Sequence, residues 1–235
     1  MLPVLRARGF PVLEFEHSTD DLADAGTDFH VTREVAHVTG AELVTSDPSA
    51  GHRLAIGLGE IVRRLEGLEA DAIPGGLRWN RDPSQWWRPR YRALLEDHRW
   101  PPAARQWAGR ILERLNTRPP GFGGWFGEML IRGDGSFVMI DWTTAGANWP
   151  CAQAAICMEG LAEWSVEHTR DLVRRFLHGY APAGLKRSEL DELRLWHIHG
   201  SLGWTMLRHP SEEEIRRATD AARRSEISDD PAIWF

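Results

Sequence analysis

The sequence predicts an α+β fold that is mostly helical, with strands near the N-terminus and one internal β-hairpin. Two observations support this prediction. Apolar residues recur at helical spacing in several segments after residue 50, and an Asp-Gly pair separates two short apolar runs near the middle of the chain. The 235 residues are enough for one large domain or two small ones.

The N-terminal part is predicted to hold short strands and then a long helix. Residues 2–15 fit the end of a short helix followed by the strand PVLEFE, and the acidic stretch 20–28 fits a loop. Residues 29–44 are rich in strand-forming side chains, with a break at Thr39-Gly40. An amphipathic helix is expected over residues 52–68, because apolar side chains recur there on one helical face.

The segment 77–101 is rich in arginine and aromatic residues and has two possible interpretations. It could hold an anionic or planar ligand, with Trp86, Trp87 and the following arginines clamping a base or a phosphate. It could equally be a helix whose arginines extend over packed rings toward water. We favour packing, since a net charge of −6 and the lack of a nucleic-acid-binding motif disfavour a nucleic-acid partner.

The remaining helices are predicted from apolar periodicity and from end signals. One covers residues 103–115 and stops before Pro119. A nearly all-apolar helix over residues 152–164 should be buried. Three further helices are expected at residues 168–178, 188–208 and 212–223. Possible capping boxes, Ser188-x-x-Asp191 and Ser211-x-x-Glu214, begin the last two.

The clearest local signal is EMLIRGDGSFVMIDW, residues 128–142. The pair Asp134-Gly135 lies between apolar runs, which predicts a tight hairpin, because both central residues of a type I′ turn need φ > 0. With that pair at the centre, the numbers of paired residues sum to 269, so Asp141 faces Glu128. The preceding run GFGGWFG, residues 121–127, and the following residues 143–150 are expected to be loops.

The predicted pairing puts two carboxylates on the same face of the hairpin, where they repel each other. Something should therefore compensate for the repulsion. A bound cation, an arginine, or a proton held on one of the acids would do so. The alternative is that the strand ends before Glu128 and that water solvates both acids.

The composition argues against several classes of protein. No apolar run reaches the length of about 18 residues that a membrane span needs, and the N-terminus has no signal-peptide layout, so a cytoplasmic protein is expected. Cys151 and Cys157 fit neither a zinc site nor a disulfide framework and are predicted to be small buried residues. On a helix His197 and His199 would point about 200° apart, so they are predicted to be ordinary core or surface histidines and not metal ligands.

The order of these segments resembles that of the aminoglycoside phosphotransferase and choline-kinase-like family, relatives of the protein kinases. The resemblance covers residues 2–208 loosely and is best over residues 137–150, which include Ile140-Asp141-Trp142. It implies a remnant of the N-terminal lobe and hinge at residues 1–44 and a kinase-like helical C-terminal lobe at residues 45–235. It also implies ATP and Mg²⁺ as cofactors and a small hydroxylated, aminoglycoside-like molecule as the substrate.

The resemblance assigns roles to a few positions. Asp141 matches the magnesium-binding aspartate of the family, and Glu128 replaces the asparagine that is the second metal ligand. A glutamate also offers oxygen ligands to Mg²⁺. The hinge that contacts adenine through its backbone corresponds to Thr32, Arg33, Glu34 and Val35.

The departures from the family concern the reaction itself. Gly123 stands at the position of the catalytic aspartate and Gly121 at that of the histidine, no lysine precedes Lys186, and the glycine-rich strands that cover the phosphates are missing. Phosphoryl transfer depends on positioning and electrostatics, so we predict a weak or inactive phosphotransferase. The alternatives are a non-catalytic ligand- or partner-binding relative, or an upstream segment that supplies the missing parts. A lobe without its covering strands would expose apolar surface, which favours a homodimer or another partner over the cleft.

Overall fold

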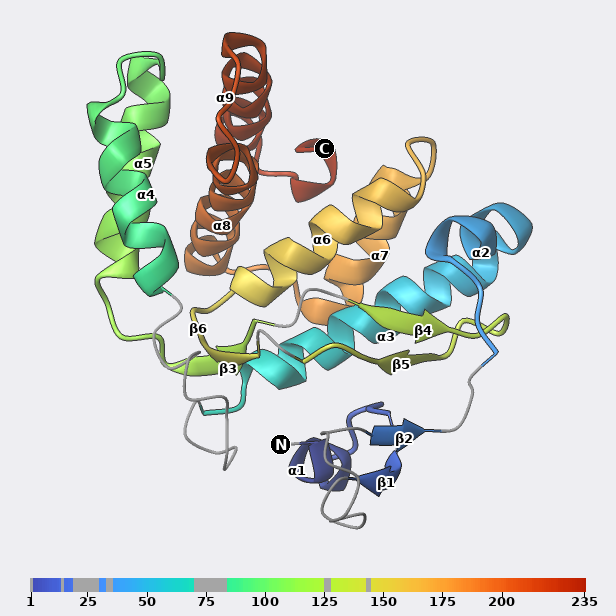
Figure 1. Ribbon diagram of the computed structural model, residues 1–235. Helices are drawn as coiled ribbons and strands as arrows, with labels where there is room; N and C mark the ends of the chain where they lie inside the picture. The colour runs from blue at the N-terminus through green and yellow to red at the C-terminus, as the bar shows by residue number, and fades with distance from the viewer. Residues whose placement is uncertain are drawn as a thin grey trace.

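The computed structural model describes residues 2–13, 15–18, 30–32, 36–69, 84–124, 128–142 and 145–235. Helices dominate these residues, and the described strands form small two-stranded antiparallel sheets (Figure 1). The predicted fold class, α+β and mostly helical, is therefore confirmed. None of the described helices is long and apolar enough to cross a membrane.

The helices of the described residues are α1 (Leu2–Ala7), α2 (Gly40–Ser46), α3 (Pro48–Glu66), α4 (Ser84–Glu96), α5 (Pro102–Leu115), α6 (Ala152–Trp164), α7 (Thr169–Tyr180), α8 (Arg187–Met206) and α9 (Glu212–Ile227). A short 3-10 turn, Pro231–Ile233, follows them. The strands are β1 (Phe15–Ser18), β2 (His30–Thr32), β3 (Gly121–Gly123), β4 (Met129–Ile131), β5 (Phe137–Met139) and β6 (Gly146–Asn148). They pair as β1–β2, β3–β6 and β4–β5.

The helices predicted from apolar periodicity are present close to their predicted bounds. α3 begins earlier than expected, because the side chain of Asp47 accepts a hydrogen bond from the Ala50 amide at 3.0 Å and Pro48 occupies the first turn. The predicted capping box of α9 is confirmed, with 2.8 Å between Ser211 N and Glu214 Oε2. The predicted capping box of α8 is wrong: the N-cap is Lys186, two residues before Ser188, and Glu189 accepts from the Lys186 amide at 2.9 Å.

Residues 40–44 are helical in α2, where the sequence had suggested strand. Thr39 and Glu42 form a reciprocal capping box, in which Glu42 Oε2 accepts from Thr39 N at 2.8 Å and Thr39 Oγ1 accepts from Glu42 N at 3.1 Å. The run T-G-A-E at residues 39–42 carries the signal of this capping box, but the β-branched residues around the run favour a strand. The predicted boundary between two lobes at residue 44 falls inside this helix, which packs on α3 and α6. The division into two lobes stays a prediction.

The glycine-aromatic run and the segment after the hairpin form a sheet where loops were expected. β3 and β6 pair antiparallel, with Gly121 opposite Asn148 and Gly123 opposite Gly146. Phe122, between the two glycines, is buried. Three-residue strands that contain glycine carry almost no local strand signal, and their pairing joins segments far apart in sequence.

The predicted hairpin exists, but its register is wrong by one residue. Met129 lies opposite Met139, and the turn holds three residues because the Arg132 amide donates to Ser136 O at 2.8 Å. Gly135 occupies the left-handed region with φ +85°, and Asp134 accepts from the Ser136 amide at 2.8 Å. A three-residue loop that ends on a left-handed glycine is the common alternative to the two-residue turn.

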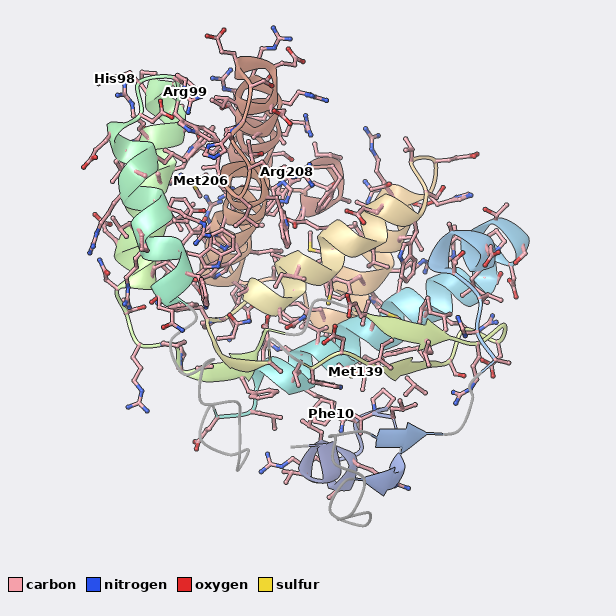
Figure 2. The ribbon with its side chains drawn as sticks, in the orientation of Figure 1. Phe10, His98, Arg99, Met139, Met206 and Arg208 are labelled. Carbon is pink, nitrogen blue, oxygen red and sulfur yellow. The ribbon has the colours of Figure 1, made fainter. Side chains whose placement is uncertain are left out.

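The N-terminal segment is attached to this hairpin. The Met139 amide donates to Pro11 O at 2.6 Å, and the Val38 amide donates to Ile131 O at 2.8 Å. Figure 2 shows Phe10 and Met139 on the two sides of the junction, and both are buried. The hairpin is thus held between the N-terminal strands and the helices (Figure 1).

The α3 and α7 backbones touch at two glycines. A Cβ atom added at Gly59 would lie 2.1 Å from Phe176 O, and one added at Gly179 would lie 2.0 Å from Ile56 O. Glycine permits this close approach because it has no side chain. The contact fixes the long helix α3 against the C-terminal helices.

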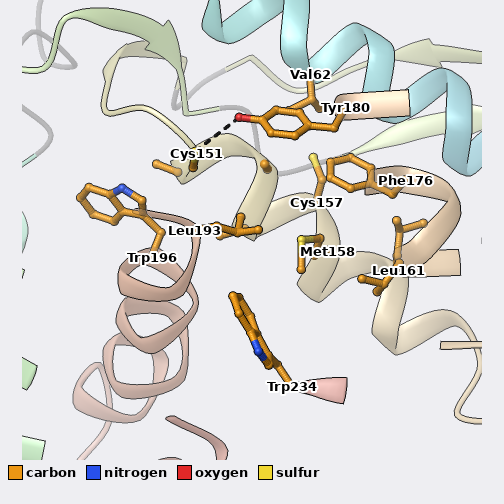
Figure 3. Packing of buried hydrophobic residues seen from close by; sticks show 14 of the residues in the cluster. Val62, Cys151, Cys157, Met158, Leu161, Phe176, Tyr180, Leu193, Trp196 and Trp234 are labelled. Atoms are coloured by element: carbon orange, nitrogen blue, oxygen red, sulfur yellow. Dashed lines mark hydrogen bonds between the residues drawn. The ribbon is translucent and has the colours of Figure 1, made fainter. Parts of the chain in front are cut away.

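The core near α6 contains both cysteines (Figure 3). Cys151 and Cys157 are buried and unpaired, as predicted, and burial raises the pKa of each thiol to about 12. α6 has no side-chain cap of its own at Cys151. The carboxylate of Glu66, at the end of α3, accepts from the amides of Cys151 at 3.1 Å and Ala154 at 3.0 Å and so caps α6 from another helix.

Candidate functional site

Glu128 and Asp141 come together, although not through the predicted register. The Ile140 amide donates to Glu128 O at 3.0 Å, so Ile140 is the residue opposite Glu128. Asp141 lies one position later, two residues after the end of β5, and has φ +47°, a left-handed conformation that allows its side chain to reach Glu128. Partial burial raises the pKa of Glu128, and a hydrogen bond with the Asp141 carboxylate raises it further.

The backbone of Asp141 has an uncommon conformation. A left-handed residue other than glycine costs roughly 1–2 kcal/mol, and such strain tends to persist at ligand sites. Apart from Asp141, Cys151 is the one non-glycine residue with positive φ among the described residues.

The chemistry of the pair fits a magnesium ion. Carboxylate oxygens are the ligands that Mg²⁺ prefers, and one or two of them commonly suffice when water and phosphate complete the shell. A divalent cation would also relieve the repulsion that raises the pKa of Glu128. Among the described residues no group of three or more histidine, cysteine or acidic side chains gathers as a metal site, so the pair would rely on such outside ligands. The metal assignment stays a prediction.

At Gly123, the position predicted to lack a catalytic aspartate, the side chain of Asn148 packs against the backbone. A Cβ atom added at Gly123 would lie 2.7 Å from Asn148 Nδ2 and 3.1 Å from Asn148 Cβ. Asn148 is 8% exposed, and its Oδ1 accepts from the Trp149 amide at 3.0 Å. At Gly121 an added Cβ would lie 3.0 Å from Glu66 O. Both positions are thus packed for glycine.

The predicted adenine hinge is only partly visible. Thr32 ends β2 and pairs with Phe15 of β1. Arg33, Glu34 and Val35 lie outside the described residues. The hinge assignment therefore stays a prediction.

Sequence reasoning missed a cavity of about 290 Å³ among α4, α6, α8 and the β3–β6 sheet. We call it the tryptophan cavity; its lining includes Trp86, Trp87, Trp149, Trp196 and Trp204. Figure 1 shows these helices rising beside the small β3–β6 sheet. The packing interpretation of the arginine-aromatic segment holds for Tyr91, which is buried, and for Arg88, which donates to Leu115 O at 3.0 Å.

A helical spacing could have indicated this cavity. On α6 the positions Ala152, Ile156 and Glu159 follow i, i+4 and i+7, and all three line it. An acid on the same face as Ala152 and Ile156, in a helix whose other polar residues are Gln153 and Glu163, was the available signal. The nearly all-apolar composition of the helix hides this signal, because it predicts a helix buried on every side.

Glu159 is the acid of the tryptophan cavity. Its side chain is 24% exposed, and it accepts a hydrogen bond from the Trp204 side chain. Burial raises its pKa to about 8, with the hydrogen bond opposing the rise and Glu163 adding to it. A Cβ atom added at Gly200 would lie 1.9 Å from Glu159 Oε1, so the carboxylate would have to move if alanine replaced this glycine.

The two histidines of α8 face different surroundings, as predicted. The Tyr91 hydroxyl lies 2.7 Å from His199 Nδ1, and burial lowers the pKa of His199 to about 4. His197 packs against Trp234 and Phe235, and burial likewise lowers its pKa to about 4. His197 Nδ1 lies 3.9 Å from Glu159 Oε1. Both rings are therefore neutral at pH 7.

These shifts predict how stability varies with pH. The folded pKa of Glu159, about 8, lies above the unfolded value of about 4.3, so its contribution is full at low pH and is lost as the pH rises to 8. The folded pKa values of His197 and His199, about 4, lie below 6.5, so their contribution is lost as the pH falls from 6.5 to 4. We therefore expect the free energy of unfolding to decline above pH 6.5, with Glu159 supplying at most about 1.4 kcal/mol per pH unit.

Urea unfolding at several pH values between 6.5 and 8 checks this prediction. The decline should be smaller in Glu159→Gln, which cannot ionise. Glu167→Gln, an exposed acid after α6, is the control and should keep the wild-type slope. An unchanged slope in Glu159→Gln would contradict the prediction.

Comparisons with known proteins identify a family from the sequence and a related fold from a solved structure. A family model described as the phosphotransferase enzyme family matches residues 1–196. A solved structure of a choline/ethanolamine kinase family protein from Mesorhizobium loti aligns with a TM-score of 0.59 at 16% sequence identity, covering 98% of this chain and 79% of that one. At this identity the likeness concerns the fold alone. No curated protein matches the chain.

Proposed function

Because this chain belongs to the phosphotransferase enzyme family, we propose that it binds a small molecule on a kinase-like fold and transfers phosphate weakly or not at all. The family membership and the fold confirm the resemblance seen in the sequence. The observation that carries the proposal is Gly123, because Asn148 occupies the space where a catalytic side chain would lie. Without that side chain, no group at this position can orient an acceptor hydroxyl or accept its proton.

The acid pair supports a nucleotide site that has outlasted the reaction. Glu128 and Asp141 would hold Mg²⁺, which when bound neutralises charge on nucleotide phosphates. No lysine precedes Lys186, so the lysine that would pair with those phosphates is missing from the sequence given. Mg²⁺ and ATP are therefore the proposed ligands of this site. The lining of the tryptophan cavity would determine the class of the substrate. We further propose a cytoplasmic location for the protein. A second copy of this chain, or another partner, would cover the cleft in place of the missing glycine-rich strands.

Two measurements test the proposal. In an ATP-turnover assay over a panel of aminoglycosides and amino alcohols, we expect no rate above the protein-free background. Robust turnover by this chain alone would overturn the claim of weak or absent transfer.

Calorimetry with Mg²⁺ and ATP tests the nucleotide site separately. Binding should require Mg²⁺ and should be lost in Asp141→Ala, because that variant removes one of the two carboxylates. Asp134→Asn is the matched control: it changes an acid in the turn of the same hairpin but keeps the side-chain oxygen that accepts from the Ser136 amide. If the wild type bound no nucleotide, the site would be vestigial and a partner-binding role would be favoured.

A further inference from the structure

The residues that follow α9 fold back against α8, where Trp234 and Phe235 contact His197. We call residues 231–235, which contain the 3-10 turn and these two rings, the aromatic segment. We propose that protonation of His197 releases the aromatic segment from α8, so that the segment acts as an acid-sensitive strap. The inference goes beyond the proposed function, because it involves neither a nucleotide nor phosphate transfer.

His197 is buried without a hydrogen-bond partner. It is 3% exposed, and neither of its ring nitrogens makes a hydrogen bond with a described residue. A neutral imidazole leaves one donor and one acceptor unsatisfied there, whereas an imidazolium ion would leave two donors and a charge. Histidine is also the side chain whose charge ordinarily changes between pH 5 and 8. The surroundings of His197 therefore accept the neutral ring and oppose the charged one.

The charged groups near His197 do not compensate for a proton on it. From α6, Glu159 Oε1 lies 3.9 Å from His197 Nδ1, which is too far for a hydrogen bond. Burial raises the pKa of Glu159 to about 8, so this carboxyl group is mostly uncharged at pH 7 and below. Burial lowers the pKa of His197 to about 4, and Arg224 of α9 lowers it further. Arg194 of α8 brings a second positive charge, which lies over the Trp234 ring with 5.9 Å to its centroid.

Two rings of the aromatic segment cover His197. The ring centroids of Trp234 and Phe235 lie 5.3 Å and 4.8 Å from that of His197. Trp234 is fully buried, and in Figure 3 its ring points toward Met158 and Leu193. If the segment detached, the imidazole would lose this cover and could bind water through both nitrogens. Solvation of the charged ring therefore requires the released state.

The aromatic segment can detach without unfolding a long helix. Its described links to the residues before it are few: Trp234 Nε1 donates to Ser228 O at 3.1 Å, and Arg224 Nε donates to Trp234 O at 3.0 Å. The turn within it is capped locally, because Asp230 Oδ1 accepts from the Ala232 amide at 3.0 Å. None of the described strands pairs with it. Such a segment, held chiefly by side-chain packing, can open locally while the rest of the fold stays intact.

Docking of the segment and protonation of His197 therefore oppose each other. A proton that binds mainly to the released state favours release, and docking disfavours the proton to the same extent. The docked pKa of His197, about 4, lies below the value of about 6.5 for a solvated histidine. Docking is thus fully favoured above pH 6.5 and weakens as the pH falls toward 4. Within this window each pH unit should change the docking equilibrium by up to about tenfold.

Hydrogen exchange measured by mass spectrometry tests the inference on the whole chain. The wild-type protein is labelled at several values between pH 7 and 5, and the protection factors are corrected for the pH dependence of intrinsic exchange. We expect the protection of the aromatic segment to fall by roughly tenfold or more between pH 7 and 5. Peptides from α3 report global unfolding and should stay protected throughout.

His197→Phe separates the proton from the packing. Phenylalanine keeps a ring, cannot ionise and has no polar atom to leave unpaired, so the segment should stay protected at every pH in this range. His209→Gln changes an exposed histidine after α8 and is the matched control, which should keep the wild-type pH dependence. Circular-dichroism melts establish that each variant is folded.

An NMR titration of the histidine rings does not depend on His197→Phe. The wild-type His197 ring, identified by its contacts with Trp234 and Phe235, should stay neutral down to about pH 5. In Phe235→Ala, which uncovers the ring, it should titrate at least about one pH unit higher. A wild-type ring that titrates near pH 6.5 would overturn the inference.

Three results of the exchange experiment would also overturn it. Protection that does not change between pH 7 and 5 would exclude release by acid. An equal fall in His197→Phe would assign the release to a group other than His197. Loss of protection in α3 together with the segment would show global unfolding and not local release. The assay contains neither ATP nor Mg²⁺, so its outcome is independent of the tests of the proposed function.

Discussion

Replacing Gly59 with alanine is expected to lower the free energy of unfolding by roughly 3 kcal/mol or more, because the new methyl group meets backbone and not a flexible side chain. The added Cβ would lie 2.1 Å from Phe176 O and 2.7 Å from Tyr180 N. α3 and α7 would have to move apart, and the buried side chains between them would lose contact. Gly179→Ala should have a similar effect from the other side, where the added Cβ would lie 2.0 Å from Ile56 O.

Gly109→Ala is the matched control for these variants. It also lies in a helix, α5, but a Cβ atom there meets nothing within 4 Å. Alanine should therefore stabilise the protein by up to about 1 kcal/mol through helix propensity. Urea unfolding of the three variants measures the difference. If Gly59→Ala were as stable as Gly109→Ala, the close contact of α3 with α7 would be refuted.

Glu66→Ala is expected to cost roughly 3–5 kcal/mol, since it leaves several buried donors without an acceptor. The carboxylate accepts from the Cys151 and Ala154 amides and from the Tyr180 hydroxyl, which lies 2.6 Å from Oε2. Burial raises the pKa of Glu66, and these hydrogen bonds oppose the rise. α6 would lose its cap, and α3 would lose its link to α7 at the same point.

The series Glu66→Ala, Glu66→Gln and Glu60→Ala isolates this effect. Glutamine keeps one acceptor oxygen and should cost less than alanine. Glu60 is exposed on the same helix, so its replacement should change stability by less than about 0.5 kcal/mol. Equal losses for Glu66→Ala and Glu60→Ala would contradict the cap. The readout is again the urea midpoint with an unchanged slope.

The sequence predicts an element best where the local pattern of apolar residues alone determines it. α6 runs from Ala152 to Trp164 as expected, because a long apolar run bounded by Pro150 leaves few alternatives. β3 and β6 escape prediction, because their short glycine-containing segments become strands only when they meet. The hairpin is intermediate: the pair Asp134-Gly135 marks the turn, but the choice between two and three loop residues changes every partner.

The acid pair shows how two side chains can meet as predicted although the register behind the prediction is wrong. Register alone would have separated Glu128 from Asp141, since Ile140 lies opposite Glu128. The left-handed backbone at Asp141 brings its side chain back to Glu128. No sequence rule applied to an Ile-Asp-Trp run indicates that conformation. The tryptophan cavity was missed for a different reason: α4, α6 and α8 each contribute to it, and only the tertiary fold places Glu159 beside Trp204.

The packing of Asn148 against Gly123 also limits how the protein could change. An aspartate introduced at position 123 would meet the Asn148 amide nitrogen before it could reach any ligand, since even its Cβ would lie 2.7 Å away. Asn148 would therefore have to shift for an aspartate to fit at position 123, and its hydrogen bond with the Trp149 amide would move with it. The residue at position 148 thus limits which side chains position 123 can accept.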